Sequence, residues 1–206
     1  MHSATRTALL LIGFQNDYFA PDGAMNAVIE ENARENDVLE NTGRILSALS
    51  ASDAPIINLP IHFSPTYEEL VRPTGLLAAI RDAGAFRRDT EGGKTIPEIL
   101  AFGDRVQHLS GKTSFNAFLG TNLEEHLREA GVEHVIVTGV VTSVCIDSTA
   151  RAAAERGFSV TIVRDASAGR NATEHAFYCD SIFPLYAQVT DTEHVIAHGP
   201  GPEVAG

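Results

Sequence analysis

Short apolar runs, bounded by glycine or polar residues, recur along the chain. Residues 8–12 are all apolar, and the run ends at Gly13. A run of this length is short for a helix and is typical of a strand buried on both faces, as in parallel sheets. Comparable runs occupy residues 55–59, 134–138 and 159–163, and weaker ones occupy residues 105–109 and 193–196. The pattern therefore predicts four clear strands and two weaker ones.

Segments with helical spacing lie between these runs. Residues 32–51 carry apolar side chains three or four positions apart, which together form one apolar stripe. Residues 121–130 and 143–156 are each followed by glycine, a common way for a helix to end. Because strands alternate with helices, we expect a doubly wound α/β fold, with a mainly parallel sheet covered by helices on both faces.

The remaining segments fit a single domain that covers residues 1–206. Residues 60–104 are the least regular part and are rich in proline, glycine and charge. We expect them to pass over the carboxyl edge of the sheet as a substrate lid. Residues 198–206 contain two glycine–proline pairs, and this tail is expected to fray.

Composition and charge narrow the functional classes. Of the 206 residues, 44% are hydrophobic, which is enough for a buried core and excludes general disorder. The formal net charge of −12 disfavours nucleic acid and anionic membranes as partners. No apolar run approaches the roughly 20 residues of a membrane span, and a signal-peptide pattern is missing at the start. Two cysteines cannot form a disulfide framework, so we expect a cytoplasmic protein.

Candidate chemistry gathers around Cys145, a few residues beyond the expected strand 134–138. Open parallel sheets bind ligands beyond the carboxyl ends of their strands. Thr142 or Ser143 can cap a helix here, which would place Cys145 in its first turn. Free backbone N–H groups and the positive end of the helix dipole favour a thiolate there. The alternative is that Cys145 is a small buried hydrophobic residue, as most cysteines are.

Lys112 follows the weak strand 105–109 and would reach the same edge of the sheet. An ammonium in that position would stabilise a thiolate further. The alternative is a solvated surface charge, the usual environment of a lysine.

Four motifs occur in a fixed order along the chain. They are Ala8–Ile12 leading into Gln15, Asn16 and Asp17; Lys112 with Phe115, Phe118 and Thr121; residues 138–145 with Thr149, Ala150 and Ala153; and Gly157 and Phe158 leading to residues 163–166. Each motif alone is a weak signal. Together they resemble the isochorismatase-like cysteine hydrolases, a family that includes nicotinamidases, N-carbamoylsarcosine amidases and ureido- or biuret-type amidohydrolases. The resemblance extends from Ala8 to about Ile196.

The resemblance implies a six-stranded parallel sheet that carries an Asp–Lys–Cys triad, with no cofactor. Cys145 would attack a carbonyl carbon and expel an amine or ammonia, and water would then hydrolyse the thioester. Such proteins have a non-proline cis peptide before the nucleophile helix, which corresponds here to Val140–Val141. The oxyanion donors would be the N–H groups of Val141 and Cys145. Family members usually assemble as homodimers or homotetramers.

The sequence departs from the family at the position of the triad aspartate, which is Gly13. Gln15, Asn16 and Asp17 all stay in register, so an alignment shift does not explain the difference. General acid–base help is worth roughly 10²–10⁴ in rate. Its loss predicts a slow enzyme, one stalled as a thioester, or one that recruits another group. Asp17 is the nearest carboxylate in sequence, but it is also typical of a turn residue.

Two further questions about Gly13 stay open at the level of sequence. The glycine is either natural or an engineered Asp→Gly change that traps substrate. If the missing carboxylate limits the reaction, a Gly13→Asp variant is expected to be faster.

Other residues are candidates for the pocket rather than for the chemistry. Nicotinamidase-type members hold a metal with an Asp-x-His pair, whereas this chain has Asn58 and a single histidine, His62, so no metal is expected. His62 would contact a polar substrate group or support the lid. Phe14, Phe19, Phe115 and Val140 would line an apolar pocket, although a core role is the alternative for the aromatic residues. Cys179 is interpreted as structural.

The preferred hypothesis is a metal-independent cysteine hydrolase that cleaves a C–N bond of a small amide, carbamoyl or ureido compound. One alternative is a non-catalytic relative that binds a small ligand or a partner subunit through the same cleft. Another is an isochorismatase-type vinyl-ether hydrolase, which needs the carboxylate and not the cysteine. The presence of Cys145 and the lack of an acid at Gly13 argue against the last of these.

Overall fold

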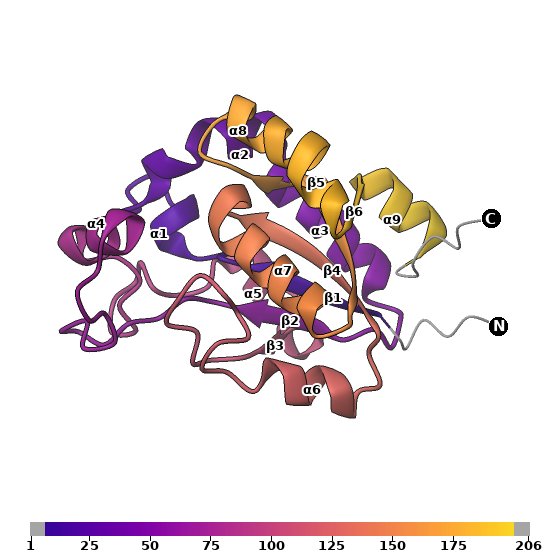
Figure 1. The fold of residues 1–206 in the computed structure, drawn as a ribbon, viewed down its shortest axis with the longest axis horizontal. Coiled ribbons are helices and arrows are strands. Elements are labelled where there is room, and N and C mark those ends of the chain that lie inside the picture. Colours follow the sequence, from indigo (N-terminus) through magenta and orange to yellow (C-terminus); the bar gives the residue numbers. More distant parts are fainter. Residues whose placement is uncertain (1–6, 200–206) are drawn as a thin grey trace.

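A computed structural model describes residues 7–199 of the chain (Figure 1). Six strands form one sheet in the order β3-β2-β1-β4-β5-β6. All neighbouring strands are parallel, which confirms the predicted doubly wound α/β fold. The strands are β1 Thr7–Ile12, β2 Ile56–Leu59, β3 Gln107–His108, β4 His134–Val140, β5 Ser159–Ala168 and β6 Gln188–Thr190.

The central strand β1 is buried on both faces, and its side chains alternate between two apolar clusters. Leu9 and Leu11 belong to the cluster that also includes residues of α3 (Val38–Leu49), α5 (Pro97–Leu100) and α9 (Thr192–His198). Ala8, Leu10 and Ile12 belong to the cluster that includes residues of α6 (Leu123–Glu129) and α7 (Asp147–Glu155). Burial on both faces explains why the sequence of this strand is apolar throughout rather than alternating.

The two central strands approach each other very closely at their carboxyl ends. Ile12 of β1 pairs with Gly139 of β4, and a Cβ atom on Gly139 would lie 2.0 Å from the Ile12 carbonyl oxygen. The pairing of β4 with β5 also shifts register between Val137 and Gly139. The glycine therefore permits a contact that brings Val140 against the residue that follows β1, Gly13.

The structure corrects two of the sequence predictions. The expected helix 32–51 is two helices, α2 (Glu30–Glu35) and α3, separated at Asp37, which adopts φ 50°. The weak strand expected at 193–196 is instead part of α9, because Asp191 caps a helix by accepting from the His194 N–H at 2.8 Å. The sixth strand is β6, a few residues earlier.

Residues 60–104 contain more regular structure than the sequence suggested. They include α4 (Gly75–Ala83), α5 and a 3₁₀ turn, η3 (Gly103–Arg105). The segment that follows α4 contacts α1 (Asn16–Phe19), the helix after β1, because the Phe86 N–H donates to Asp17. Most of the tail expected to fray lies outside the described residues. Within residues 7–199, no helix has the length and apolarity to cross a membrane. The other helical segments are η2 Asn26–Val28, η4 Thr142–Ile146, α8 Ala172–Phe177, η5 Tyr178–Ile182 and η6 Phe183–Leu185.

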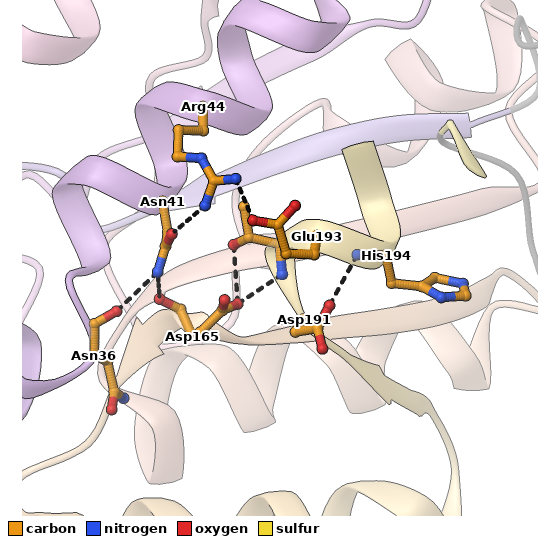
Figure 2. Close-up of polar contacts among 8 residues, drawn as sticks. Asn36, Asn41, Arg44, Asp165, Asp191, Glu193 and His194 are labelled. Carbon is orange, nitrogen blue, oxygen red and sulfur yellow. Dashed lines mark hydrogen bonds and ion pairs between the residues drawn. The ribbon is translucent and has the colours of Figure 1, made fainter. Parts of the chain in front are cut away.

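A polar network joins α3, β5 and α9 (Figure 2). One carboxylate oxygen of Asp165 accepts from both the backbone N–H and the hydroxyl of Thr192, at 2.8 and 2.9 Å. Asn41 donates to the Asp165 carbonyl oxygen at 2.9 Å. Thr192 is fully buried, whereas the Arg44–Glu193 ion pair at the edge of the network is exposed. The buried part of the network therefore carries most of its stabilising effect.

We expect an Asp165→Ala variant to lose about 1–3 kcal/mol of unfolding free energy, because it leaves two buried donors of Thr192 without an acceptor. A matched Glu193→Ala variant removes only an exposed ion pair and is expected to lose less than about 1 kcal/mol. Urea denaturation of both variants measures the difference. Equal losses would contradict this division of the network.

Candidate active site

Cys145 lies in a single π-helical turn, Thr142–Ile146, between the end of β4 and the start of α7. The residue at the N-cap is Val141, so the predicted capping by Thr142 or Ser143 is wrong. Both hydroxyls contact α8 instead. The Thr142 hydroxyl lies 2.8 Å from His175 Nδ1, and the Ser143 hydroxyl donates to Glu174 at 2.7 Å. These contacts fix the turn that carries the sulfur.

The structure brings Lys112 and Cys145 together. Lys112 Nζ lies 3.6 Å from Cys145 Sγ. Lys112 is fully buried and Cys145 is 3% exposed. Burial lowers the pKa of Lys112, and the attraction of the Cys145 sulfur opposes part of that shift. The pair is therefore an amine and a thiol group in contact, with little access to water.

Lys112 is held by the segment that follows β2. The backbone N–H of His62 donates to the Lys112 carbonyl oxygen at 2.9 Å. The His62 ring in turn donates from Nε2 to the Gly93 carbonyl oxygen at 2.8 Å. Burial lowers the pKa of His62. The hydrogen bond to Gly93 raises it in part, and the nearby charges of Arg88 and Lys112 lower it again. His62 thus lies beside the lysine, and its Nε2 proton is committed to the backbone.

Gly13 occupies a position that suits glycine. Its φ is +75°, in the left-handed region. A Cβ atom there would lie 2.9 Å from the Val140 carbonyl oxygen and 3.1 Å from Val140 Cγ2. A side chain at this position thus meets both backbone strain and a close contact, so Gly13→Asp tests more than the return of a carboxylate.

Both carboxylate oxygens of Asp17 accept hydrogen bonds from backbone N–H groups. Its Oδ2 atom accepts from the Phe86 N–H at 2.6 Å, and its Oδ1 atom accepts from the Ala24 N–H at 3.3 Å. The side chain is 5% exposed. Asp17 therefore ties the segment after β1 to the 86-loop, in agreement with its interpretation as a turn residue.

Tyr18 lies at the site and was missed from the sequence. Its Cε2 atom would be 3.5 Å from a Cβ on Gly13, and its ring packs on Phe86 with centroids 4.7 Å apart. Burial, followed by the negative charges of Cys145 and Asp17, raises the pKa of Tyr18 well above its usual value. The phenol therefore keeps its proton beside the sulfur. The sequence signal that could have identified it is the tyrosine hydroxyl next to Phe19, shortly after the end of the first predicted strand.

The Val141 N–H at the end of β4 is compatible with the predicted role as an oxyanion donor. That role, for Val141 and for Cys145, stays a prediction. The Val140–Val141 peptide bond is cis. The Val141 carbonyl oxygen accepts from the N–H groups of Val144 and Ile146, at 3.0 and 3.2 Å. Across residues 7–199, no acceptor is bound to the Val141 N–H itself. A donor beside Cys145 is therefore available to a ligand.

The predicted aromatic pocket residues are spread over both faces of the sheet. Phe14 is fully buried and stacks on Phe19, with centroids 5.4 Å apart. Phe19 also lines a hollow of about 350 Å³ next to α2 and α3. Phe115 is half-buried and packs against the cluster on the α7 side. Phe14 and Phe115 thus belong to different apolar clusters, and Phe14 has a core environment.

The residues present do not fit the metal site of nicotinamidase-type proteins. Asn58, at the position of the aspartate, donates to Thr95 at 2.9 Å and contacts His108 at 3.1 Å. His62 donates to a carbonyl oxygen. In the described part of the chain, no group of three or more His, Cys, Asp or Glu side chains is placed to hold a metal ion.

The structure thus combines an α/β fold with a buried cysteine and lysine in contact beyond the strand ends. Residues 7–194 match the Isochorismatase domain family, and the chain belongs to this family of hydrolases. The isochorismatase family protein YddQ of Bacillus subtilis (strain 168) is 30% identical over 200 residues, with 91% of this chain and 97% of that protein covered.

Two further proteins extend the comparison. Nicotinamidase 3 of Arabidopsis thaliana is 30% identical over 118 residues, which is 57% of this chain and 60% of that protein. A cysteine hydrolase from Pseudomonas syringae pv. phaseolicola 1448A superimposes with a TM-score of 0.84 at 23% identity, covering 95% of this chain and 92% of the other. The structural match confirms the fold.

We expect Gly13→Ala to lose more unfolding free energy than a Gly131→Ala control. Both glycines have positive φ, so both variants carry backbone strain of about 1–3 kcal/mol. Only Gly13 also has a carbonyl oxygen within 2.9 Å of the new Cβ, since nothing lies within 4 Å at Gly131. Thermal or urea unfolding of the two variants measures the difference. Equal losses would show that the Val140 carbonyl moves away from the new Cβ atom at little cost in free energy.

We expect Lys112→Met to increase the unfolding free energy at pH 7, because a buried amine is replaced by an apolar side chain of similar length and the Cys145 sulfur can take up a proton once the ammonium is gone. An amine kept at a cost to stability is typical of a functional group. Urea denaturation is the measurement, with Lys94→Met as the exposed control. A less stable Lys112→Met protein would indicate a structural role for the lysine.

Proposed function

We propose that the protein is a cysteine hydrolase that cleaves a C–N bond of a small amide, carbamoyl or ureido compound. The observation that carries the proposal is the contact between Lys112 Nζ and Cys145 Sγ at the carboxyl edge of the sheet. Membership of a hydrolase family supports it. Similarity to an Arabidopsis thaliana protein named as a nicotinamidase also supports it, since the name denotes an enzyme that cleaves an amide bond.

The reaction begins with the sulfur of Cys145 as nucleophile. The Lys112 ammonium, 3.6 Å away and shielded from water, stabilises the thiolate. The thiolate attacks the carbonyl carbon of the substrate, and the electron pair of the C=O bond moves to oxygen. We assign the binding of this oxyanion to the N–H groups of Val141 and Cys145, and the lack of an acceptor for the Val141 N–H within residues 7–199 supports this assignment.

Collapse of this intermediate breaks the C–N bond and leaves a thioester on Cys145. Water then attacks the thioester, and the C–S bond breaks to release the acid. No step uses a metal ion, because Asn58 and His62 are already committed within the protein. The phenol of Tyr18, protonated and next to Gly13, is a donor for a polar group of the substrate.

Ammonia release across a panel of amides, carbamates and ureides tests the proposal. The wild-type protein is expected to turn over at least one of them, and Cys145→Ala to release none. Cys179→Ala is the matched control, because burial raises the pKa of the Cys179 thiol to about 11 and keeps it protonated. Intact-mass analysis of the wild-type protein should show one acyl adduct, on Cys145.

The outcomes separate the rival functions. Tight binding of a panel compound by wild type and by Cys145→Ala alike, without turnover by either, would identify a non-catalytic binding protein. Equal turnover by wild type and Cys145→Ala would refute a role for the sulfur.

A further inference from the structure

A hydrolase of this kind has to deliver a proton to the departing nitrogen and later remove one from water. The family resemblance assigns these proton transfers to an aspartate at the position of Gly13, which has no side chain to do either. The left-handed backbone and the Val140 carbonyl oxygen occupy the space that such a side chain would need. If the proposed C–N hydrolysis occurs, another group carries this proton.

Three other titratable side chains lie close to Gly13 or Lys112: Asp17 and Tyr18 follow Gly13 in α1, and His62 lies beside Lys112. Both carboxylate oxygens of Asp17 accept backbone N–H groups. Tyr18 holds its proton too tightly to exchange it in the neutral range, because burial and two negative charges raise its pKa. His62 lies within the field of Lys112, and its Nε2 proton is bound to the Gly93 carbonyl oxygen. Among the described residues, none of the three forms a hydrogen bond with the Cys145 sulfur.

Lys112 differs from these groups in both contact and environment. Its Nζ atom contacts the nucleophile at 3.6 Å, and its side chain is fully buried. Along residues 7–199, no carboxylate forms an ion pair with this amine. A lysine that is buried without a carboxylate gives up its proton more readily than one in water.

We propose that Lys112 carries the catalytic proton in both half-reactions, so that Cys145 and Lys112 form a self-sufficient dyad in place of the triad. This inference rests on the proposed function and deepens it. Lys112 thereby has a chemical role in addition to its electrostatic one.

The proton balance of the dyad closes without a third group. In the resting pair, the sulfur is a thiolate and Lys112 is an ammonium. The thiolate attacks, the C–S bond forms, and the ammonium gives its proton to the nitrogen as the C–N bond breaks, so the amine or ammonia leaves neutral. The neutral Lys112 amine then takes a proton from water while the hydroxide oxygen attacks the thioester. Breakage of the C–S bond releases the acid and restores the thiolate–ammonium pair.

The dyad makes a specific prediction for the pH dependence. The reactive form needs a protonated Lys112, so activity should fall on the alkaline side when this amine deprotonates. Because burial lowers the pKa of Lys112 from 10.5, that fall should occur below pH 10.5. His62, Tyr18 and Asp17 are the other titratable groups on the elements around the pair, and an alkaline limb that follows one of them instead of Lys112 would contradict the dyad.

The chain contains only two lysines, Lys94 and Lys112, which makes the titration direct. In a protein labelled with ¹³C at lysine Cε, two signals are expected, and Lys94→Arg assigns them. The proposal requires the Lys112 midpoint to coincide with the alkaline limb of turnover. A Lys112 signal that titrates only above pH 10.5, or an alkaline limb that is independent of it, would overturn the dyad.

Substitution separates the charge of Lys112 from its proton. Lys112→Arg keeps a positive charge that does not exchange protons in this range. On an amide substrate, turnover should fall by roughly 10²–10⁴. On a p-nitrophenyl ester, whose leaving group needs no proton, the variant should still release one equivalent of nitrophenol and then stall as an acyl–Cys145 adduct visible by intact mass.

A second variant guards against a poor fit of arginine in the buried site. Lys112→Ala should lose turnover and regain part of it when methylamine or another small primary amine is added, with a saturable dependence. Lys94→Ala is the matched control. It should keep normal turnover and show no effect of added amine, since Lys94 is exposed and paired with Glu91.

The outcomes distinguish the dyad from the function on which it rests. Amide turnover by Lys112→Arg within threefold of wild type would overturn the dyad and leave the cysteine hydrolase intact. Absence of amine rescue in a folded Lys112→Ala protein would also overturn it. Failure of the wild-type protein to acylate Cys145 with either the amide or the ester would instead refute the proposed function.

Discussion

The buried contact between an amine and a sulfur sets the conditions for everything else at this site. An ammonium removed from water is costly unless a negative partner lies against it, and the group in contact with Lys112 is the Cys145 sulfur. The two groups depend on each other, since each favours the charged form of its neighbour. The surrounding fold has to hold them a few ångströms apart and keep water out.

The sheet achieves this with its central strands. The close approach of Ile12 and Gly139 brings the ends of β1 and β4 together, and the π-helical turn after β4 then presents the sulfur. Contacts from Thr142 and Ser143 to α8 fix that turn, while the segment after β2 holds Lys112 through its carbonyl. Three parts of the chain that are distant in sequence therefore position one pair of atoms, and none of them is catalytic on its own.

The sequence was a good guide where burial dictates the pattern and a poor one where single contacts decide. Apolar runs located β1, β2, β4 and β5 because these strands are covered on both faces. The α9 helix was mistaken for a strand because four residues cannot distinguish the two, and the Asp191 cap that decides is a single contact. The pairing of Lys112 with Cys145 followed from their order at strand ends. The commitment of Asp17 to backbone N–H groups, the place of Tyr18 and the φ of Gly13 depend on long-range packing that no local pattern encodes.

The conformation at Gly13 also bears on how the site can be redesigned. An aspartate side chain there would meet the Val140 carbonyl and a left-handed backbone. Placing an acid at this position therefore requires a compensating shift of the neighbouring main chain as well as the new side chain. The surroundings of the lysine are a more direct target for redesign than Gly13 itself.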